Sequence, residues 1–385
     1  MDNTYLDNNI KSSCNGCGVC ALVCPMKCIK MVTDEEGFLY PEIDKEKCIN
    51  CGKCKNYCGN FNSKKDADER AYIAINKSSD ELKMASSGGM FYLLAKYTIE
   101  KNGVVCGVTY NEDLEVVHEF ADNLEDCKKF CGSKYVRSYL QDSYKKAKEY
   151  LENGRYVLFT GTACQLSGLK KYLSKDYDNL ILCDILCHAN PSPKVFKQYI
   201  SNIEKNENKK VKDVLFRDKN TGWKNQVPTI VFEDGTIKTE NSYFNAFVRE
   251  MINRPSCYSR QFATQRRITD FTIADLWGIE KVDATVDTTN GVSLLTVNSL
   301  KGRTIFNEIN NQMNFKETDY NLVASYNHYH NVLQHKNRDS FFKGIASGTI
   351  NENNIISYMN RYTNGTIIKK GLRKIKRVVK KIIKK

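Results

Sequence analysis

The sequence predicts an α+β protein in three parts: a small cysteine-rich domain, a larger α/β domain and a basic amphipathic helix near the C-terminus. Three observations predict this organisation. Nine of the sixteen cysteines fall between Cys14 and Cys58. From Ala71 onwards, short apolar runs alternate with amphipathic helical patterns. The segment 369–385 contains ten Lys or Arg and no acidic residue.

The basic charge of the chain is concentrated in that last segment. The formal net charge is +13, and removing the ten basic residues of 369–385 leaves about +3 for the rest. A charge confined to a tail gives no basic surface on the body of the protein. We therefore expect no nucleic-acid partner.

The start of the chain predicts a cytoplasmic protein. Residues 1–14 are polar and acidic, unlike the apolar core of a signal peptide. No apolar run approaches the roughly 18 residues that a membrane-spanning helix needs. In a reducing compartment, cysteines this dense should bind metal rather than form disulfides.

The cysteines of the predicted domain 1–62 form two runs with the same spacing. In each run, three cysteines two residues apart can wrap three irons of one cubane, and the fourth starts a helix that carries it to the other cluster. We therefore predict a bacterial-ferredoxin-like domain with two [4Fe–4S] clusters and crossed ligation. The first cluster is assigned to Cys14, Cys17, Cys20 and Cys58, and the second to Cys48, Cys51, Cys54 and Cys24.

Zinc is the alternative metal, because it also uses paired C-x2-C motifs. Zinc has no use, however, for a third cysteine in each triplet followed by a fourth three residues later. The pattern therefore favours iron. Cys28 is expected in the helix after Pro25, as a small core residue rather than a ligand.

After a polar linker at 62–70, the pattern predicts strands and helices in alternation. Asn102-Gly103 should end the first helix, and Asp234-Gly235 should form the turn of a hairpin. The expected strands are 72–76, 104–110, 156–160, 180–186, the hairpin 229–240 and 271–278.

Two turns at helix starts are candidate phosphate sites. The segment 86–89 (SSGG) opens a helix that runs to about Glu100, and 160–165 (TGTACQ) lies between a strand and a helix. Free backbone amides at such positions suit an anionic ligand. Simple helix capping is the alternative for both. Neither turn is a G-x-G-x-x-G or Walker A sequence.

The order of six segments resembles the beta subunit family of coenzyme F420 hydrogenase/dehydrogenase, in its bacterial branch with a fused two-cluster ferredoxin domain. The segments are SSGG (86–89), GSKYV (132–136), GTACQ (161–165), CHANPSP (187–193), RPSCYSR (254–260) and ADLWG (274–278). The resemblance covers residues 10 to about 345. It implies one catalytic domain, with 70–150 as its N-terminal part and 151–345 as its C-terminal part.

This resemblance implies a flavin-binding large domain that holds FAD and moves electrons between iron–sulfur clusters, flavin and a small-molecule acceptor. The FAD candidates that it implies are Ser87, Gly88, Gly89, Lys134, Tyr135, Thr160, Gly161, Thr162 and Gln165. His188 becomes a candidate proton donor near the flavin, with a structural, hydrogen-bonded histidine as the alternative. Asp275 is either a charged neighbour of the flavin or a strand-end residue.

The chain departs from the family pattern where a further cluster is often held. Cys164, Cys187 and Cys257 are present, but the position of the usual fourth cysteine is Arg260, whose guanidinium cannot ligate iron. The three cysteines could hold a third cluster with a different fourth ligand, or they could line the flavin pocket. Ala189 and Ala274 also replace usual glycines.

In the predicted tail 366–385, apolar residues recur every three or four positions opposite lysines and arginines. This pattern is typical of a helix that lies on an anionic membrane surface. A solvated, frayed tail is the alternative. The tail would hold the protein at the inner membrane face.

Taken together, these features predict an iron–sulfur flavoprotein oxidoreductase. It would take electrons from a donor such as ferredoxin, pass them through two clusters to FAD, and reduce an organic substrate. The resemblance suggests a sugar or lipid-linked sugar in surface polysaccharide biosynthesis as that substrate. The alternatives are an electron-transfer subunit without substrate chemistry and an F420-linked oxidoreductase.

Overall fold

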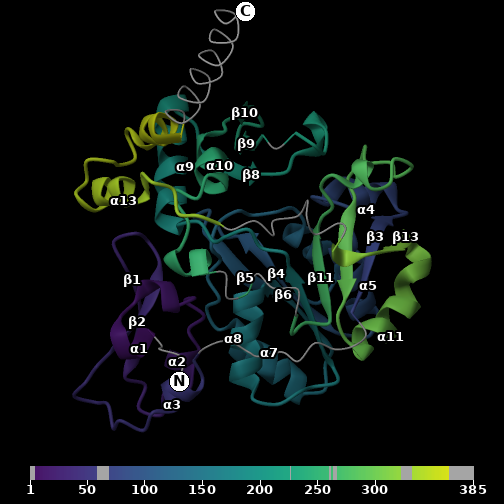
Figure 1. The fold of residues 1–385 in the computed structure, drawn as a ribbon, viewed down its shortest axis with the longest axis horizontal. Helices are drawn as coiled ribbons and strands as arrows, with labels where there is room; N and C mark the ends of the chain where they lie inside the picture. The colour runs from purple at the N-terminus through teal and green to yellow at the C-terminus, as the bar shows by residue number, and fades with distance from the viewer. Residues whose placement is uncertain are drawn as a thin grey trace, which may run out of the picture.

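The computed structural model describes residues 5–58, 69–225, 227–259, 262, 267–321 and 332–363. Most of the predicted linker (62–68), Arg260 and the predicted tail 366–385 lie outside the described residues. Within the described part the fold is α+β, as predicted, with a small cysteine-rich region beside a large mixed sheet (Figure 1).

The cysteine-rich region repeats one local structure. In both runs a glycine with positive φ, Gly18 (77°) or Gly52 (69°), directly precedes a one-turn helix. Only glycine adopts this conformation without strain, so each triplet can turn sharply around its third cysteine. The elements are α1 (Tyr5–Asn8), α2 (Val19–Leu22), the antiparallel pair β1 (Ile29–Thr33) and β2 (Leu39–Ile43), and α3 (Lys53–Asn56).

The helix predicted after Pro25 is wrong. The helical turn α2 precedes Cys24, and residues 24–27 form a turn in which the Lys27 amide donates to the Cys24 carbonyl. Lys27 has a φ of +51°, which ends any helix there. Cys28 therefore lies directly before β1, where it is buried.

One eight-stranded sheet spans both predicted parts of the large domain, in the order β13-β3-β12-β11-β7-β6-β4-β5. β3 pairs with β12, and β4 pairs with β6, so the segments 70–150 and 151–345 share this sheet. The strands are β3 (Arg70–Asn76), β4 (Val104–Tyr110), β5 (Val116–Ala121), β6 (Val157–Thr162), β7 (Leu180–Ile185), β11 (Phe271–Asp275), β12 (Ser293–Val297) and β13 (Met313–Thr318).

Helices cover both faces of this sheet, because its central strands are apolar on both sides. In β6, Leu158 packs with α5 and α11, while Val157 and Phe159 pack with α7 and α8 on the opposite face. The helices of this domain are α4 (Ser79–Met84), α5 (Met90–Glu100), α6 (Leu124–Cys127), α7 (Ser143–Glu152), α8 (Ala163–Leu173) and α11 (Leu300–Ile309).

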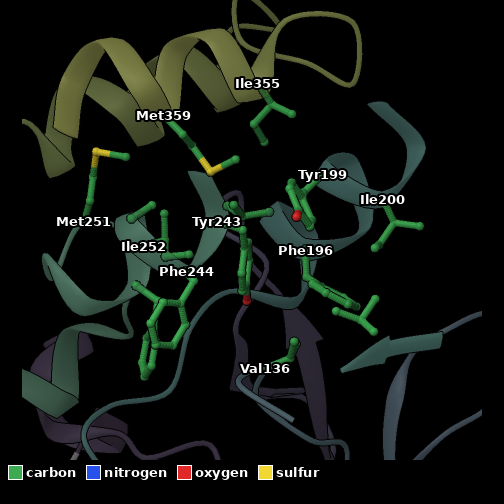
Figure 2. Close-up of a cluster of buried hydrophobic side chains, with 14 of the residues drawn as sticks. Val136, Phe196, Tyr199, Ile200, Tyr243, Phe244, Met251, Ile252, Ile355 and Met359 are labelled. Atoms are coloured by element: carbon green, nitrogen blue, oxygen red, sulfur yellow. The ribbon is translucent and has the colours of Figure 1, made fainter. Parts of the chain in front are cut away.

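A three-stranded sheet packs with helices around an aromatic core, which also includes Phe38 and Tyr40 of the cysteine-rich region (Figure 2). At its centre Tyr243 contacts Phe196 edge-on and Tyr199 at a tilt, and Met359 from the helical residues 355–363 closes the top. Its elements are β8 (Val211–Leu215), β9 (Thr229–Phe232), β10 (Ile237–Thr239), α9 (Pro193–Glu207), α10 (Ser242–Val248) and α13 (Arg338–Ala346).

Candidate functional site

The sheet register brings the predicted motifs to one edge. Ile273 in β11 pairs with Ile185 in β7, which pairs with Thr162 in β6. These strands are parallel, so the residues that follow them leave at the same edge. β3 joins this edge through β12, where Ser293 pairs with both Ala74 and Asp275. The turns at 86–89 and 161–165, with Cys187 and Asp275, therefore lie along the carboxyl edge.

The first predicted set of cluster ligands lines one pocket. Cys14, Cys17, Cys20 and Cys58 surround it, together with Cys164 and Gly168 from α8. A Cβ on Gly168 would stand 2.9 Å from Cys17 Cβ, so the glycine lets this cysteine loop touch α8. Burial raises the pKa of Cys17 to about 12. This pocket is therefore at the contact between the small and large domains.

The second predicted set lines a separate pocket, formed by Cys24, Cys48, Cys51 and Cys54. Cys28 also lines it, and its Sγ lies 3.4 Å from Cys24 Sγ. Cys28 is buried, as expected of a core residue, but the sequence did not reveal that it neighbours the second set. Cys51 is exposed. The second site therefore presents one exposed thiol to solvent, whereas the four thiols of the first set are all part-buried.

The donor chemistry of both pockets fits a [4Fe–4S] cluster. Each pocket gathers the four thiols predicted for its cluster, with Cys164 beside the first set and Cys28 beside the second, and all of them are free cysteines. Thiolates are the ligands that such clusters use, and each pocket offers the required number.

A third pocket lies at the ends of β6 and β7. Cys164, Cys187 and Cys257 all line it, so the structure brings these three cysteines together. Cys164 also lines the first cluster pocket, which makes the two pockets neighbours. Burial raises the pKa of the Cys187 and Cys257 thiols.

Buried arginines connect the third pocket with the first cysteine run. Arg137 donates to the carbonyls of Asn15 (3.0 Å) and Gly16 (3.4 Å) and to Cys164 Sγ (3.4 Å). Arg254, which is 1% exposed, donates to the carbonyls of Cys14 and Leu39. Both guanidinium groups hold the first loop against the large domain. The resemblance placed Arg254 in a motif, but neither residue was predicted to have this role.

His188 lines the third pocket and has a carboxylate neighbour. Its Nε2 lies 2.5 Å from Glu250 Oε1, and Glu250 Oε2 accepts a hydrogen bond from Asn253 Nδ2. The ring packs edge-on against Phe247. The histidine is thus held in one orientation beside the cysteines. Its partner Glu250 lies far along the chain, so the sequence could not reveal this contact.

The turn at 86–89 opens α5 as predicted, but Gly88 packs between strands. A Cβ there would lie 2.3 Å from the Ala74 carbonyl oxygen, and the Gly88 amide donates to Ser293 Oγ. This amide is therefore not available to a phosphate. Gly89 is the N-cap of α5, with a φ of +84°. Ser86 Oγ accepts hydrogen bonds from Ser133, which joins this turn to the segment 132–136.

We expect Gly88→Ala to lower the free energy of unfolding by about 1–3 kcal/mol, because the added methyl meets strand backbone. Gly161→Ala is the matched comparison. Its Cβ would meet only the side chains of Gln165 (3.2 Å) and His118 (3.3 Å), which can shift. Denaturant unfolding of both variants measures the difference, and equal losses would contradict the packing role of Gly88.

Asp275 lies in a buried cluster that the sequence did not predict. Arg217 Nη1 lies 2.5 Å from Asp275 Oδ2, and the Trp223 indole also donates to this carboxylate. Trp223 stacks on Trp277 with ring centroids 4.6 Å apart. Burial raises the pKa of Asp275, opposed by the Arg217 charge. Arg217 and Trp223 follow β8 of the three-stranded sheet. They are far from Asp275 in sequence, and only the tertiary fold brings them together.

Tyr135 and Lys219 extend this cluster toward the turn at 86–89. Burial raises the pKa of Tyr135, with Asp275 and Arg217 among its charged neighbours. Lys219 Nζ donates to the Ser87 carbonyl, and burial lowers its pKa to about 8. Ser87, Tyr135 and Asp275 are therefore brought together. The cluster thus combines hydroxyl groups, a carboxylate paired with Arg217, a lysine and two stacked indoles.

Lys134 and the turn at 160–165 make mainly structural contacts. Lys134 Nζ donates to the carbonyls of Lys129 and Cys131, and burial lowers its pKa to about 8. Thr162 and Gln165 form a reciprocal capping box at the start of α8. Thr160 Oγ1 donates to the Cys106 carbonyl, and Gly161 lies beside Gln165. These contacts at 160–165 are those of simple helix capping, which was the alternative to a phosphate site. Thr162 also lines the third pocket.

Comparisons with known proteins match two segments of the chain. The family model for the C-terminal part of the beta subunit of coenzyme F420 hydrogenase/dehydrogenase matches residues 154–321. A model for a 4Fe-4S dicluster domain matches residues 13–60. No curated protein matches the chain.

Among solved structures, the chain is similar to one chain of the F420-reducing [NiFe] hydrogenase complex from Methanosarcina barkeri, studied by xenon derivatization. The two share 16% sequence identity with a TM-score of 0.45, over 79% of this chain and 93% of that chain. In the described part of the molecule, no helix has both the length and the apolar character needed to cross a membrane.

Proposed function

Because the chain belongs to the coenzyme F420 hydrogenase/dehydrogenase beta subunit family and carries a 4Fe–4S dicluster domain ahead of the family domain, we propose that it is an iron–sulfur flavoprotein oxidoreductase. It relays electrons from a ferredoxin-type donor through two [4Fe–4S] clusters to FAD and on to an organic substrate. The matches to the two family models support electron transfer through iron–sulfur clusters. The flavin and the substrate are our proposal.

The observation that carries this proposal is the succession of cysteine-lined pockets. The second set, with Cys51, is open to solvent, whereas the first set contacts α8 through Cys17. Cys164 then lines both the first pocket and the third. Such a series supports a path from solvent to the carboxyl edge of the sheet, where α/β proteins bind their ligands.

When bound, the clusters carry single electrons, and FAD collects two of them for transfer to an organic molecule. Ser87, Tyr135 and the Asp275 cluster are the part of the predicted FAD site with the most suitable side chains. The full proposed set stays as the sequence predicts it: Ser87, Gly88, Gly89, Lys134, Tyr135, Thr160, Gly161, Thr162 and Gln165.

The two proposed catalytic side chains are each held by a charged partner. Glu250 holds the His188 ring through Nε2, which suits a histidine that delivers a proton to substrate. Arg217 holds Asp275 in place beside Trp277. The structure places them in different surroundings, because His188 lines the third pocket and Asp275 lies in the tryptophan cluster.

The third pocket could hold a third cluster. Arg137 donates to Cys164, and Arg254 and Arg267 line the pocket, so three cations would offset the charge of thiolates. Cys164, Cys187 and Cys257 supply three thiols, and the fourth ligand would come from elsewhere. The alternative is that these cysteines line the flavin pocket.

The proposed substrate is a sugar or lipid-linked sugar of surface polysaccharide biosynthesis. An F420-linked reaction is the second candidate, favoured by the name of the matching family model. An electron-transfer subunit without substrate chemistry is the third. A flavin reducible through the clusters, in a pocket that a small molecule can enter, would favour an enzyme.

Anaerobic purification with cofactor extraction tests the proposal. We expect brown protein with about eight irons and eight acid-labile sulfides per chain, together with FAD. About twelve irons would show a third cluster at Cys164, Cys187 and Cys257. Colourless protein with zinc would overturn the cluster proposal, and cluster-loaded protein without flavin would overturn the flavoprotein proposal.

The predicted tail lies outside the described residues, and we propose from its sequence that it holds the protein on an anionic membrane. Full-length protein should co-sediment with vesicles containing anionic lipid, and a chain ending at Gly365 should not. Binding should fall with salt, and also when Ile375, Val379 and Ile382 become polar at constant charge. Equal sedimentation of the two chains would contradict this proposal.

A further inference from the structure

The second cysteine pocket opens on a face that has apolar and basic side chains around it. Met26 and Ile49 line the pocket and are 45% and 61% exposed. Large apolar side chains this exposed, next to a site open to solvent, are typical of a surface that another molecule covers.

Lysines surround these two apolar side chains. Six exposed lysines come from the segments 24–30 and 45–56, namely Lys27, Lys30, Lys45, Lys47, Lys53 and Lys55. The same segments contain one acidic residue, Glu46. Lys47 pairs with Asp44, and Lys55 pairs with Asp7. Among the residues that the structure describes, no ion pair engages Lys27 or Lys53.

Three acidic residues of the small domain, Asp34, Glu35 and Glu36, lie apart from this face. In the turn between β1 and β2, Glu36 forms a buried ion pair with Arg338 of α13. Asp34 and Glu35 in the same turn pair with Lys11. This acidic turn therefore contacts the large domain. The six lysines beside the second pocket outnumber the four nearby acids, Asp7, Glu42, Asp44 and Glu46, so the exposed face keeps a net positive charge.

We propose that this lysine face, defined by Met26, Ile49 and the six lysines, is the docking site of a small acidic one-electron carrier protein. The proposal rests on the proposed function and names the entry point of its electrons. One electron leaves the carrier and reduces the second cluster, with no bond formed or broken and no proton transferred. Opposite charges would speed and orient the encounter, and the two apolar side chains would supply a desolvated centre.

A charge-reversal experiment on the full chain tests this proposal. The probe is a reduced, acidic two-cluster ferredoxin, mixed anaerobically with cluster-loaded protein in a stopped-flow instrument. Lys27→Glu/Lys53→Glu should lower the second-order rate constant at low salt by about tenfold or more. It should also flatten the salt dependence of that rate constant. Reduction by excess dithionite should still go to completion, because this small reductant needs no docking surface.

Two matched variants complete the design. Lys212→Glu/Lys343→Glu changes the same number of exposed charges on β8 and α13, and it should leave the carrier rate unchanged. Ile49→Ser should slow reduction by the carrier while keeping its salt dependence. An unchanged carrier rate in Lys27→Glu/Lys53→Glu would overturn the docking site.

Two further outcomes are distinguishable from that failure. If dithionite reduces no cluster in the unmodified protein, the proposed function itself fails. If the charge reversal abolishes vesicle binding but not carrier reduction, the face contacts membrane, and the docking proposal is overturned.

Discussion

Replacing Cys58 with Ala should remove the cluster nearest the large domain, although Cys58 belongs to the second cysteine run. Cys58 lines the same pocket as Cys14, Cys17 and Cys20, so its loss leaves that site with three thiols. Iron content should fall from about eight to about four per chain.

The surviving cluster identifies the ligand assignment. The second pocket includes exposed Cys51, whereas the four cysteines of the first are part-buried and Cys17 contacts α8. After Cys58→Ala, a water-soluble paramagnetic agent should strongly relax the EPR signal of the remaining cluster. If the remaining cluster is instead protected from this agent, the ligation is not crossed.

The corresponding variant for the second cluster, which removes Cys24, needs two substitutions. Cys28 Sγ lies 3.4 Å from Cys24 Sγ in the same pocket, so Cys24→Ala alone leaves a nearby thiol that can serve as fourth ligand. Cys24→Ala/Cys28→Ala should lose the second cluster and keep the first. Cys28→Ala alone is the control and should retain about eight irons. Loss of the first cluster in the double variant would contradict the assignment.

The cysteine sites were predictable because their geometry is largely local. The spacing of each run determines which thiols can share a cubane, and glycines at 18 and 52 give both runs the same turn. The helix after Pro25 was wrong because Lys27 adopts positive φ, which a lysine rarely does and spacing does not reveal. The proximity of Cys28 to the second set follows from that turn.

The strands at 104–110, 180–185 and 271–275 were predictable from apolar runs, because buried parallel strands are apolar on both faces. Less was predictable at the carboxyl edge. The Asp275 cluster depends on Arg217 and Trp223, which lie more than fifty residues earlier and carry no local pattern. Gly88 also illustrates this limit. In sequence, a glycine that leaves room for a phosphate cannot be told apart from one that packs against strand backbone.

Replacing Gly168 with Leu should separate the first cluster site from the large domain and largely stop electron transfer between them. A Cβ at this position would meet Tyr144 Oη at 2.7 Å and Cys17 Cβ at 2.9 Å. Tyr144 is fully buried and donates to the Gln165 carbonyl, so it cannot move away easily. The cysteine loop is the more mobile neighbour, because α8 is fixed in the main core by Leu166 and Leu169.

Two measurements separate undocking from loss of the clusters in Gly168→Leu. Iron content should stay near eight per chain, because no ligand is changed, while amide exchange should rise in the segment 14–20. Reduction of the proposed flavin by dithionite-reduced clusters should slow markedly. Gly344→Leu in α13 is the matched control. The atoms nearest to a Cβ there belong to Ile350, which is part of neither the cysteine loop nor α8, so both readouts should be unchanged. Normal exchange and normal electron transfer in Gly168→Leu would show that contact between Cys17 and α8 is not the route into the large domain.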